Sequence, residues 1–146
     1  GLPAWLEGPV WLPPPPDLGG KKPRASWNPA ALAFLGDGVW ELYARRAHFA
    51  PPRRPRDYAV AVKKEVMAEA QAVYVEVLVG DEFLTQEELQ VMRWGYNSGT
   101  ASAGSPKRLK SGNLGGTGVY RTATGLEVLT GYLYLTDPGR LDAMME

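Results

Sequence analysis

The sequence predicts an all-α fold. Apolar residues recur every three or four positions along most of the chain, which is the spacing of a helix with one buried face. Residues that commonly begin helices precede these stretches, as in Asn28 followed by Pro29 and in Thr85 with Glu88 three positions later. No stretch has the strict alternation that favours a strand. The 146 residues, 45% of them hydrophobic, suffice for one core, so we expect one folded domain.

The first 26 residues differ in composition from the rest, because they are rich in proline and include the run from Pro13 to Pro16. Proline-rich sequence favours an open, extended chain over a packed element. We therefore expect an extended or partly disordered arm over 1–26, followed by the folded domain over 27–146. Trp5, Leu6 and Trp11 could pin part of the arm to this domain.

The first helix is expected at about 29–48, with a stripe of apolar residues on one side. Asp37 lies off the centre of this stripe. The proline-rich turn from Pro51 to Pro55 ends the helix, because proline cannot continue it. A second helix is expected from near Asp57 to about Val79, with its valines on one side.

The capping residue Thr85 predicts a third helix that continues to about Trp94. A long glycine- and serine-rich loop follows at about 95–119, and connections of this length are usually functional or disordered. A fourth helix is expected at about 120–135. Asp137 followed by Pro138 then begins a short last helix.

The formal net charge of zero conceals an uneven distribution of charged residues. Between Glu88 and Glu127 the chain has no acidic residue, and a second basic cluster begins at the end of the first helix and continues after it. Clusters of this kind are typical of nucleic-acid binding, although a solvated surface would also explain them. The basic residues of the two regions are Arg93, Lys107, Arg108, Lys110 and Arg121 in the first and Arg45, Arg46, Arg53, Arg54 and Arg56 in the second.

The absence of cysteine excludes disulfides, thiolate zinc sites and cysteine nucleophiles. Any bound metal must be held by oxygen or by the single histidine, His48, which favours a hard ion such as Mg²⁺ or Mn²⁺. Apolar runs are too short to span a bilayer, so we expect a soluble protein without a membrane partner.

Two carboxylates are candidates for metal binding. Asp37 follows a glycine inside an apolar helix, and Glu127 is the first acid after the long basic interval. Taken singly, Asp37 could pair with a nearby arginine and Glu127 could be an ordinary exposed residue. Taken together, two carboxylates from separate helices can share a divalent cation that activates water against a phosphodiester.

The motifs around these acids resemble the ribonuclease III family. ALAFLGDGVWELYARR at 31–46 is similar to its signature helix, and TGLEVLTGYLYL at 124–135 is similar to its second motif. The segments EAQ at 69–71, FLTQEE at 83–88 and RWGYN at 93–97 resemble the shorter Mini-ribonuclease III branch, which lacks a separate RNA-binding domain.

This resemblance implies a ribonuclease III endonuclease-domain fold over 27–146 that acts as a homodimer and cleaves double-stranded RNA. Asp37 and Glu127 would then be the catalytic residues and the ligands of Mg²⁺, with Mn²⁺ as a possible substitute. The substrate is expected to be a ribosomal RNA precursor or another structured RNA, including introns. Candidate interface residues are Phe34, Leu35 and Trp40, for which a core position is the alternative. Candidate RNA-binding residues are Arg53, Arg54, Arg93, Asn97, Lys107, Arg108, Lys110 and Arg121.

The chain also departs from the family pattern. Full-length relatives carry further acids where this chain has Ala30, Ala33 and Thr124, and those losses also resemble the shorter branch. Tyr96 stands where related sequences have an arginine, and the basic residues of the 95–119 loop could compensate. The alternatives are an inactive RNA-binding or ribonucleoprotein scaffold, which retention of both acids disfavours, and a plain helical interaction module.

The segments ELYARR, RWG and GYLYLT resemble the chloroplast versions of the family. They predict a location in the chloroplast stroma, or in the cytoplasm if the chain is bacterial. An arm without an initiator methionine fits a chain whose transit peptide has been removed, and a chain trimmed in another way would look the same.

Overall fold

The computed structural model describes residues 13–98 and 115–145. This part of the chain contains helices and no strand, which confirms the predicted all-α fold. None of its helices combines the length and the apolar character needed to cross a membrane. The helices are α1 (Pro23–Ser26), α2 (Pro29–Phe49), α3 (Pro55–Val66), α4 (Ala68–Gly80), α5 (Gln86–Tyr96), α8 (Gly115–Thr136) and α9 (Pro138–Met145).

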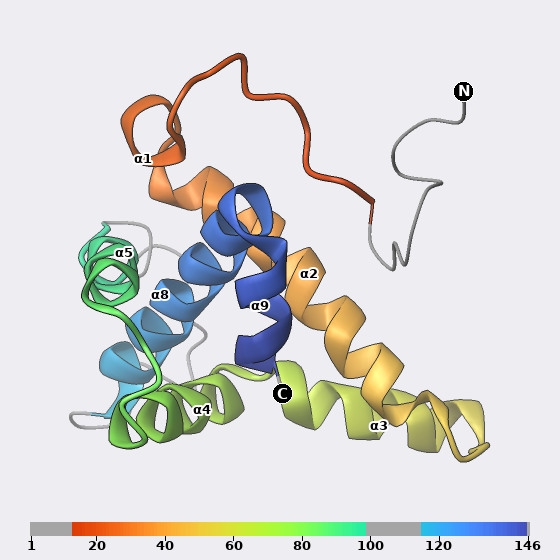
Figure 1. The fold of residues 1–146 in the computed structure, drawn as a ribbon. Helices are drawn as coiled ribbons and strands as arrows, with labels where there is room; N and C mark the ends of the chain where they lie inside the picture. Colours follow the sequence, from red (N-terminus) through yellow and green to blue (C-terminus); the bar gives the residue numbers. More distant parts are fainter. Residues whose placement is uncertain (1–12, 99–114, 146) are drawn as a thin grey trace, which may run out of the picture.

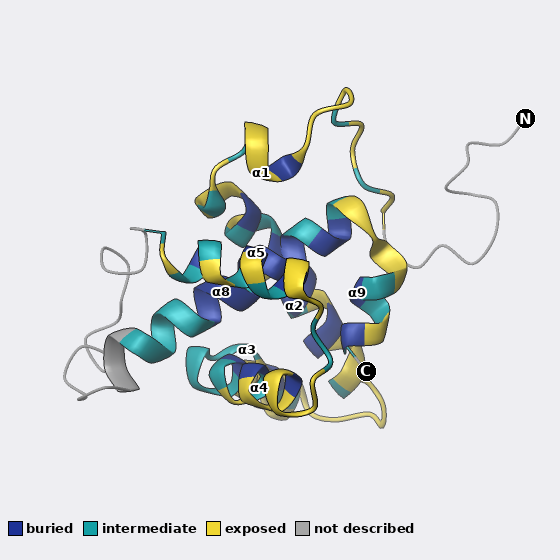
Figure 2. Cartoon of the chain, turned by 60° about the vertical axis from the view of Figure 1, so that its left-hand side comes forward, coloured by how far each residue is buried: buried dark blue, intermediate teal, exposed yellow. Residues whose placement is uncertain are grey.

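Helix α8 is the central element, and α2, α4, α5 and α9 all pack against it (Figure 1). Its middle is buried on nearly every side, as Figure 2 shows, because its residues there are small or apolar. The buried hydroxyls of Thr124 and Thr130 donate to carbonyls one turn back in the same helix, so they cost little in the core. The side chains around α8 form one core.

Helix α2 packs against α8 and contributes several side chains to this core. The Trp40 ring meets the Tyr74 ring edge to face at 5.1 Å, and its Nε1 donates to the Glu65 carbonyl at 3.0 Å. The Tyr43 hydroxyl donates to Asp142 at 3.2 Å, which ties α2 to α9. These contacts anchor the turn of α2 that follows Asp37.

The predicted second helix, Asp57 to Val79, is wrong as one element. The backbone breaks at Met67, whose ψ of 148° is extended, and the break separates α3 from α4. As a result α3 packs against α2, whereas α4 packs against α8. Apolar periodicity alone did not reveal the break, because the valines keep a helical spacing through it.

The other predicted elements agree with the structure more closely. Helices α2, α5 and α9 have about the expected bounds, and Thr85 and Glu88 form the predicted capping box. Helix α8 begins at Gly115, several residues before the expected start. Within the arm, Pro23–Ser26 is a short helix, and the Tyr134 hydroxyl donates to the Pro13 carbonyl at 2.6 Å. Trp5, Leu6 and Trp11 lie outside the described residues.

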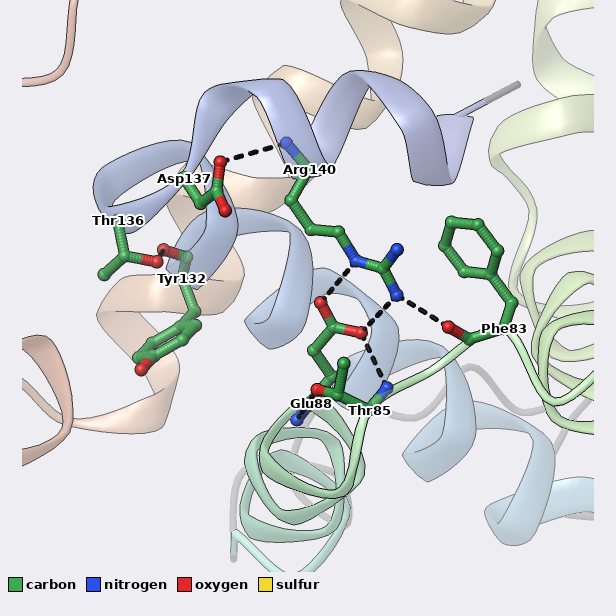
Figure 3. A network of polar contacts seen from close by, with 7 residues as sticks. All are labelled: Phe83, Thr85, Glu88, Tyr132, Thr136, Asp137 and Arg140. Atoms are coloured by element: carbon green, nitrogen blue, oxygen red, sulfur yellow. Dashed lines mark hydrogen bonds and ion pairs between the residues drawn. The ribbon is translucent and has the colours of Figure 1, made fainter.

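An ion pair joins α9 to the start of α5 (Figure 3). Arg140 donates from Nε to Glu88 Oε2 at 2.7 Å and from Nη2 to Glu88 Oε1 at 2.8 Å, and Nη2 also donates to the Phe83 carbonyl. Hydrogen bonding from Arg140 lowers the pKa of Glu88 although the carboxylate is buried. This network ties the start of α5 to α9, which itself packs against α8.

Candidate active site

Two glycines allow helices α2 and α8 to cross with their backbones in contact. A Cβ atom on Gly36 would overlap the carbonyl of Glu127, and one on Gly131 would overlap the carbonyl of Leu32. Any larger residue would therefore force the two helices apart. Because Asp37 follows Gly36 directly, the crossing places Asp37 beside Glu127.

The two acids of this crossing interact electrostatically. Burial raises the pKa of Glu127 to about 8, and the negative charge of Asp37 adds to the rise. The pKa of Asp37 is also raised, first by partial burial and then by Glu41 one turn further along α2. Glu127 is the more buried acid, so it takes up a proton first and thereby relieves the repulsion from Asp37.

This donor set fits a hard divalent cation. Two carboxylates that repel each other in a partly buried place are stabilised by a positive charge between them, and oxygen is the ligand that Mg²⁺ and Mn²⁺ prefer. Within residues 13–98 and 115–145, no three histidine or acidic side chains gather at one point. The protein would therefore supply Asp37 and Glu127, and the remaining ligands would be water or substrate oxygens.

His48 does not belong to this pair. It lies about three turns beyond Asp37 on α2, and its Nε2 is 3.2 Å from Glu65 Oε1. His48 Nδ1 is 3.4 Å from Nη1 of Arg53. The histidine thus connects the end of α2 to α3.

Sequence reasoning missed one buried residue that influences Glu127. Gln71, in the first turn of α4, is only 1% exposed, and the influence of its side chain partly offsets the rise in the pKa of Glu127. The sequence marked it only as part of the EAQ segment at 69–71 that resembles the family, and this segment does not reveal its burial, which depends on the break at Met67. The influence of Glu41 on Asp37 could have been predicted, since residues four apart share a helix face.

A second pair of glycines brings α5 against α8, and a groove lies beside this contact. A Cβ atom on Gly95 would come 2.8 Å from that of Val128, and one on Gly125 would come 2.7 Å from the Met92 carbonyl oxygen. The groove has a volume of about 420 Å³ and is lined by Val75, Leu89, Met92, Arg93, Tyr96, Asn97 and Thr122. Of the predicted RNA-binding residues, Arg93 and Asn97 lie here.

Arg121 borders the same groove, with its guanidinium 5.1 Å from the centre of the Tyr96 ring. The tyrosine that replaces an arginine of the family pattern therefore contacts another arginine. Arg53 and Arg54 lie in the connection between α2 and α3, far from α5 on the other side of the molecule (Figure 1). Lys107, Arg108 and Lys110 lie outside the described residues.

The three candidate interface residues have different environments. Phe34 is 86% exposed on α2, Leu35 is half-buried, and Trp40 is buried in the core. For Trp40 the structure thus favours the alternative, a core position. Phe34 is an exposed aromatic ring three residues before Asp37 and remains a candidate for an interface.

Comparisons with known proteins identify the family. The Ribonuclease III domain model matches residues 30–138, which include Asp37 and Glu127. The chain belongs to the ribonuclease III family. This result confirms the family predicted from the sequence and, with it, the class of enzyme, an endoribonuclease.

Individual relatives agree with this assignment. The chain is 42% identical over 124 residues to a Mini-ribonuclease 3 of Thermosynechococcus vestitus, covering 85% of this chain and 75% of that protein. It is 41% identical over 120 residues to a Mini-ribonuclease 3 of Synechocystis, covering 82% of this chain and 76% of that protein. A crystal structure of a Fusobacterium nucleatum protein is 25% identical and superposes with a TM-score of 0.70, covering 86% of this chain and 93% of that chain.

Proposed function

We propose that this ribonuclease III chain cleaves double-stranded RNA with Mg²⁺, for which Mn²⁺ can substitute, and that Asp37 and Glu127 hold the ion. The observation that carries the proposal is the contact of α2 with α8 at Gly36 and Gly131. It places two coupled carboxylates from different helices together, at a position that the backbone fixes before any ligand binds.

The chemistry follows from these two side chains. When bound, the ion would polarise the scissile phosphodiester, activate water for attack and neutralise the developing negative charge. Asp37 and Glu127 act as ionised ligands, so a cation between them favours loss of the proton that the raised pKa of Glu127 retains. Because their backbones are locked together, little reorganisation is needed at this point.

The groove between α5 and α8 is suited to the backbone of an RNA duplex. Arg93 and Asn97 are exposed there and can bind phosphate or 2′-hydroxyl oxygens, and Tyr96 holds the Arg121 guanidinium at its edge. A-form RNA is recognised mainly by shape, phosphates and 2′-hydroxyls, so we expect little sequence preference from these residues.

We further propose that the enzyme is a homodimer with Phe34 in its interface. The Phe34 ring is 86% exposed and lies three residues before Asp37. Burial of this ring by a second copy of the chain would stabilise the dimer, because it removes apolar surface from water. Ribosomal RNA maturation, processing of other structured RNA and a chloroplast location are parts of the same proposal. They are supported by the resemblance of the sequence to the chloroplast versions of the family.

The experiment is cleavage of a labelled RNA duplex by the parent chain and by Asp37→Asn and Glu127→Gln, with Mg²⁺ and with EDTA. We expect cleavage by the parent that requires metal and is lost in both variants, while circular dichroism and sedimentation show that both still fold and associate. Duplex binding by the parent without cleavage, in Mg²⁺ and in Mn²⁺, would instead identify a scaffold protein.

A further inference from the structure

Gln71 is a polar side chain buried beside the candidate metal ligands. It is 1% exposed, and its Nε2 is shielded from solvent without a hydrogen bond of ordinary geometry. Burial of an amide is unfavourable unless it is hydrogen-bonded, so an amide in this state calls for a physical explanation.

The neighbouring residue Glu127 explains why the amide of Gln71 is buried. The amide lies near this carboxylate, although it falls short of full hydrogen-bond geometry, and its influence lowers the pKa of Glu127 against the larger effect of burial. Hydrogen bonds of catalytic groups are often long in the unliganded protein and tighten when the ligand binds. An N–H donor is the kind of partner that an ionised carboxylate ligand requires.

The backbone directs Gln71 to this place. The break at Met67 turns the chain so that α4 packs mainly against α8. The Gln71 N–H donates to the Met67 carbonyl at 3.0 Å, so the first turn of α4 is fixed directly after the break. The segment at 69–71, which the sequence showed only as part of a family resemblance, thus has a structural role.

We propose that Gln71 is a positioning residue for Glu127, whose ionised carboxylate it holds through its side-chain N–H in the orientation that binds the divalent cation. This inference rests on the proposed function in one respect, namely that Asp37 and Glu127 are the metal ligands. Gln71 itself contacts neither the ion nor the RNA.

If Gln71 had a purely structural role, its replacement would lower the stability of the metal-free protein. A positioning role predicts no such loss. Gln71→Met keeps the length of the side chain and removes its polar atoms. Burial of an incompletely paired amide is unfavourable, and an apolar group of similar shape avoids that cost without breaking a well-formed hydrogen bond. We therefore expect Gln71→Met to unfold at or above the temperature of the parent in the absence of metal, although it binds metal more weakly.

The test is a titration of the metal-free full chain with Mn²⁺, in which electron paramagnetic resonance measures the free ion. We expect the dissociation constant of Gln71→Met to rise about tenfold, the lower end of the effect of removing a partner of a metal ligand. Val91→Ala, a core substitution in α5, serves as the control and should bind like the parent. In cleavage assays, Gln71→Met should need more Mg²⁺ and approach the parental rate at saturation.

Parental Mn²⁺ affinity in folded Gln71→Met would overturn the inference and leave the proposed function intact. If Gln71→Met does not fold, Gln71→Asn, which withdraws the amide by one methylene, must show the same loss of affinity. Failure of the parent to bind Mn²⁺, or binding that survives Asp37→Asn, would overturn the metal site itself and the inference with it.

Discussion

The backbone of Gly36 lies against that of Gly131 so closely that neither residue can carry a side chain in place. A Cβ atom on Gly36 would come 2.9 Å from the Gly131 nitrogen, and one on Gly131 would come 3.3 Å from the Gly36 nitrogen. The distance between α2 and α8 is thus set by two residues without side chains. The position of Asp37 relative to Glu127 depends on that distance.

Gly131→Ala should separate the two helices. The added methyl group would overlap the Leu32 carbonyl, and overpacking of this kind costs about 1–3 kcal/mol of stability. Cleavage should fall by about 100-fold, because a shift of roughly an ångström between catalytic groups has an effect of that size. Gly118→Ala in the same helix has open space at its Cβ and should be neutral or stabilising. Equal behaviour of the two variants in urea unfolding and cleavage would show that close approach is not needed.

The raised pKa of Glu127 makes the metal-free protein less stable as the pH rises. The folded state retains the proton up to about pH 8, whereas the unfolded chain releases it near its ordinary value of 4.5. Stability should therefore decline between these two values. Glu127→Gln should remove this decline, and Mg²⁺ should reduce it in the parent alone. Melting temperatures between pH 5 and pH 8.5, with EDTA and with Mg²⁺, measure both effects; parallel curves for parent and variant would contradict the assignment of the pKa.

Much of this arrangement could be predicted from the sequence. The family motifs identified Asp37 and Glu127, and helical spacing with caps located α2 and α5, because these features are local. The approach of Gln71 to Glu127 could not be predicted, because it depends on the break at Met67. A single extended residue there is not visible in apolar periodicity. The burial of Trp40 also depends on tertiary contacts, with Tyr74 on α4 and the Glu65 carbonyl on α3.

Loss of the Arg140 side chain should destabilise the fold strongly at neutral pH. Arg140→Met would leave the Glu88 carboxylate buried without its cation, which costs about 3 kcal/mol. Because Arg140 lowers the pKa of Glu88, the stabilisation is present above pH 4.5 and is lost as the pH falls through the folded pKa below it. Urea unfolding at pH 7 and at pH 3 should show the gap to the parent shrinking in acid. Arg45→Ala, which breaks an exposed pair with Glu41, should cost less than about 1 kcal/mol.

Arg121 should contribute to RNA affinity through charge, with Tyr96 keeping its guanidinium at the groove. In a Glu127→Gln background that does not cleave RNA, Arg121→Ala should weaken duplex binding. It should also make the decrease of log K, the logarithm of the binding constant, with log salt concentration shallower by about 1. Tyr96→Phe retains the ring and should bind like the background, whereas Tyr96→Ala should be weaker. Arg46→Ala, which removes a similar contact with Tyr43 away from this groove, is the control. Fluorescence anisotropy at several salt concentrations would refute the assignment if Arg46→Ala lowered the slope and Arg121→Ala did not.

Phe34→Asp should dissociate the proposed dimer without unfolding the chain. The ring is 86% exposed in the single chain, so the substitution removes little internal packing, whereas a carboxylate buried between two copies would be strongly unfavourable. Phe49→Asp is the matched control, because Phe49 lies at the end of the same helix and is 72% exposed. Sedimentation velocity should show a monomer for Phe34→Asp and a dimer for Phe49→Asp and the parent. If Phe34→Asp were still a dimer, the interface would lie on another face of the molecule. Monomeric Phe34→Asp that still cleaved both strands of a duplex at the parental rate would show that one chain is sufficient.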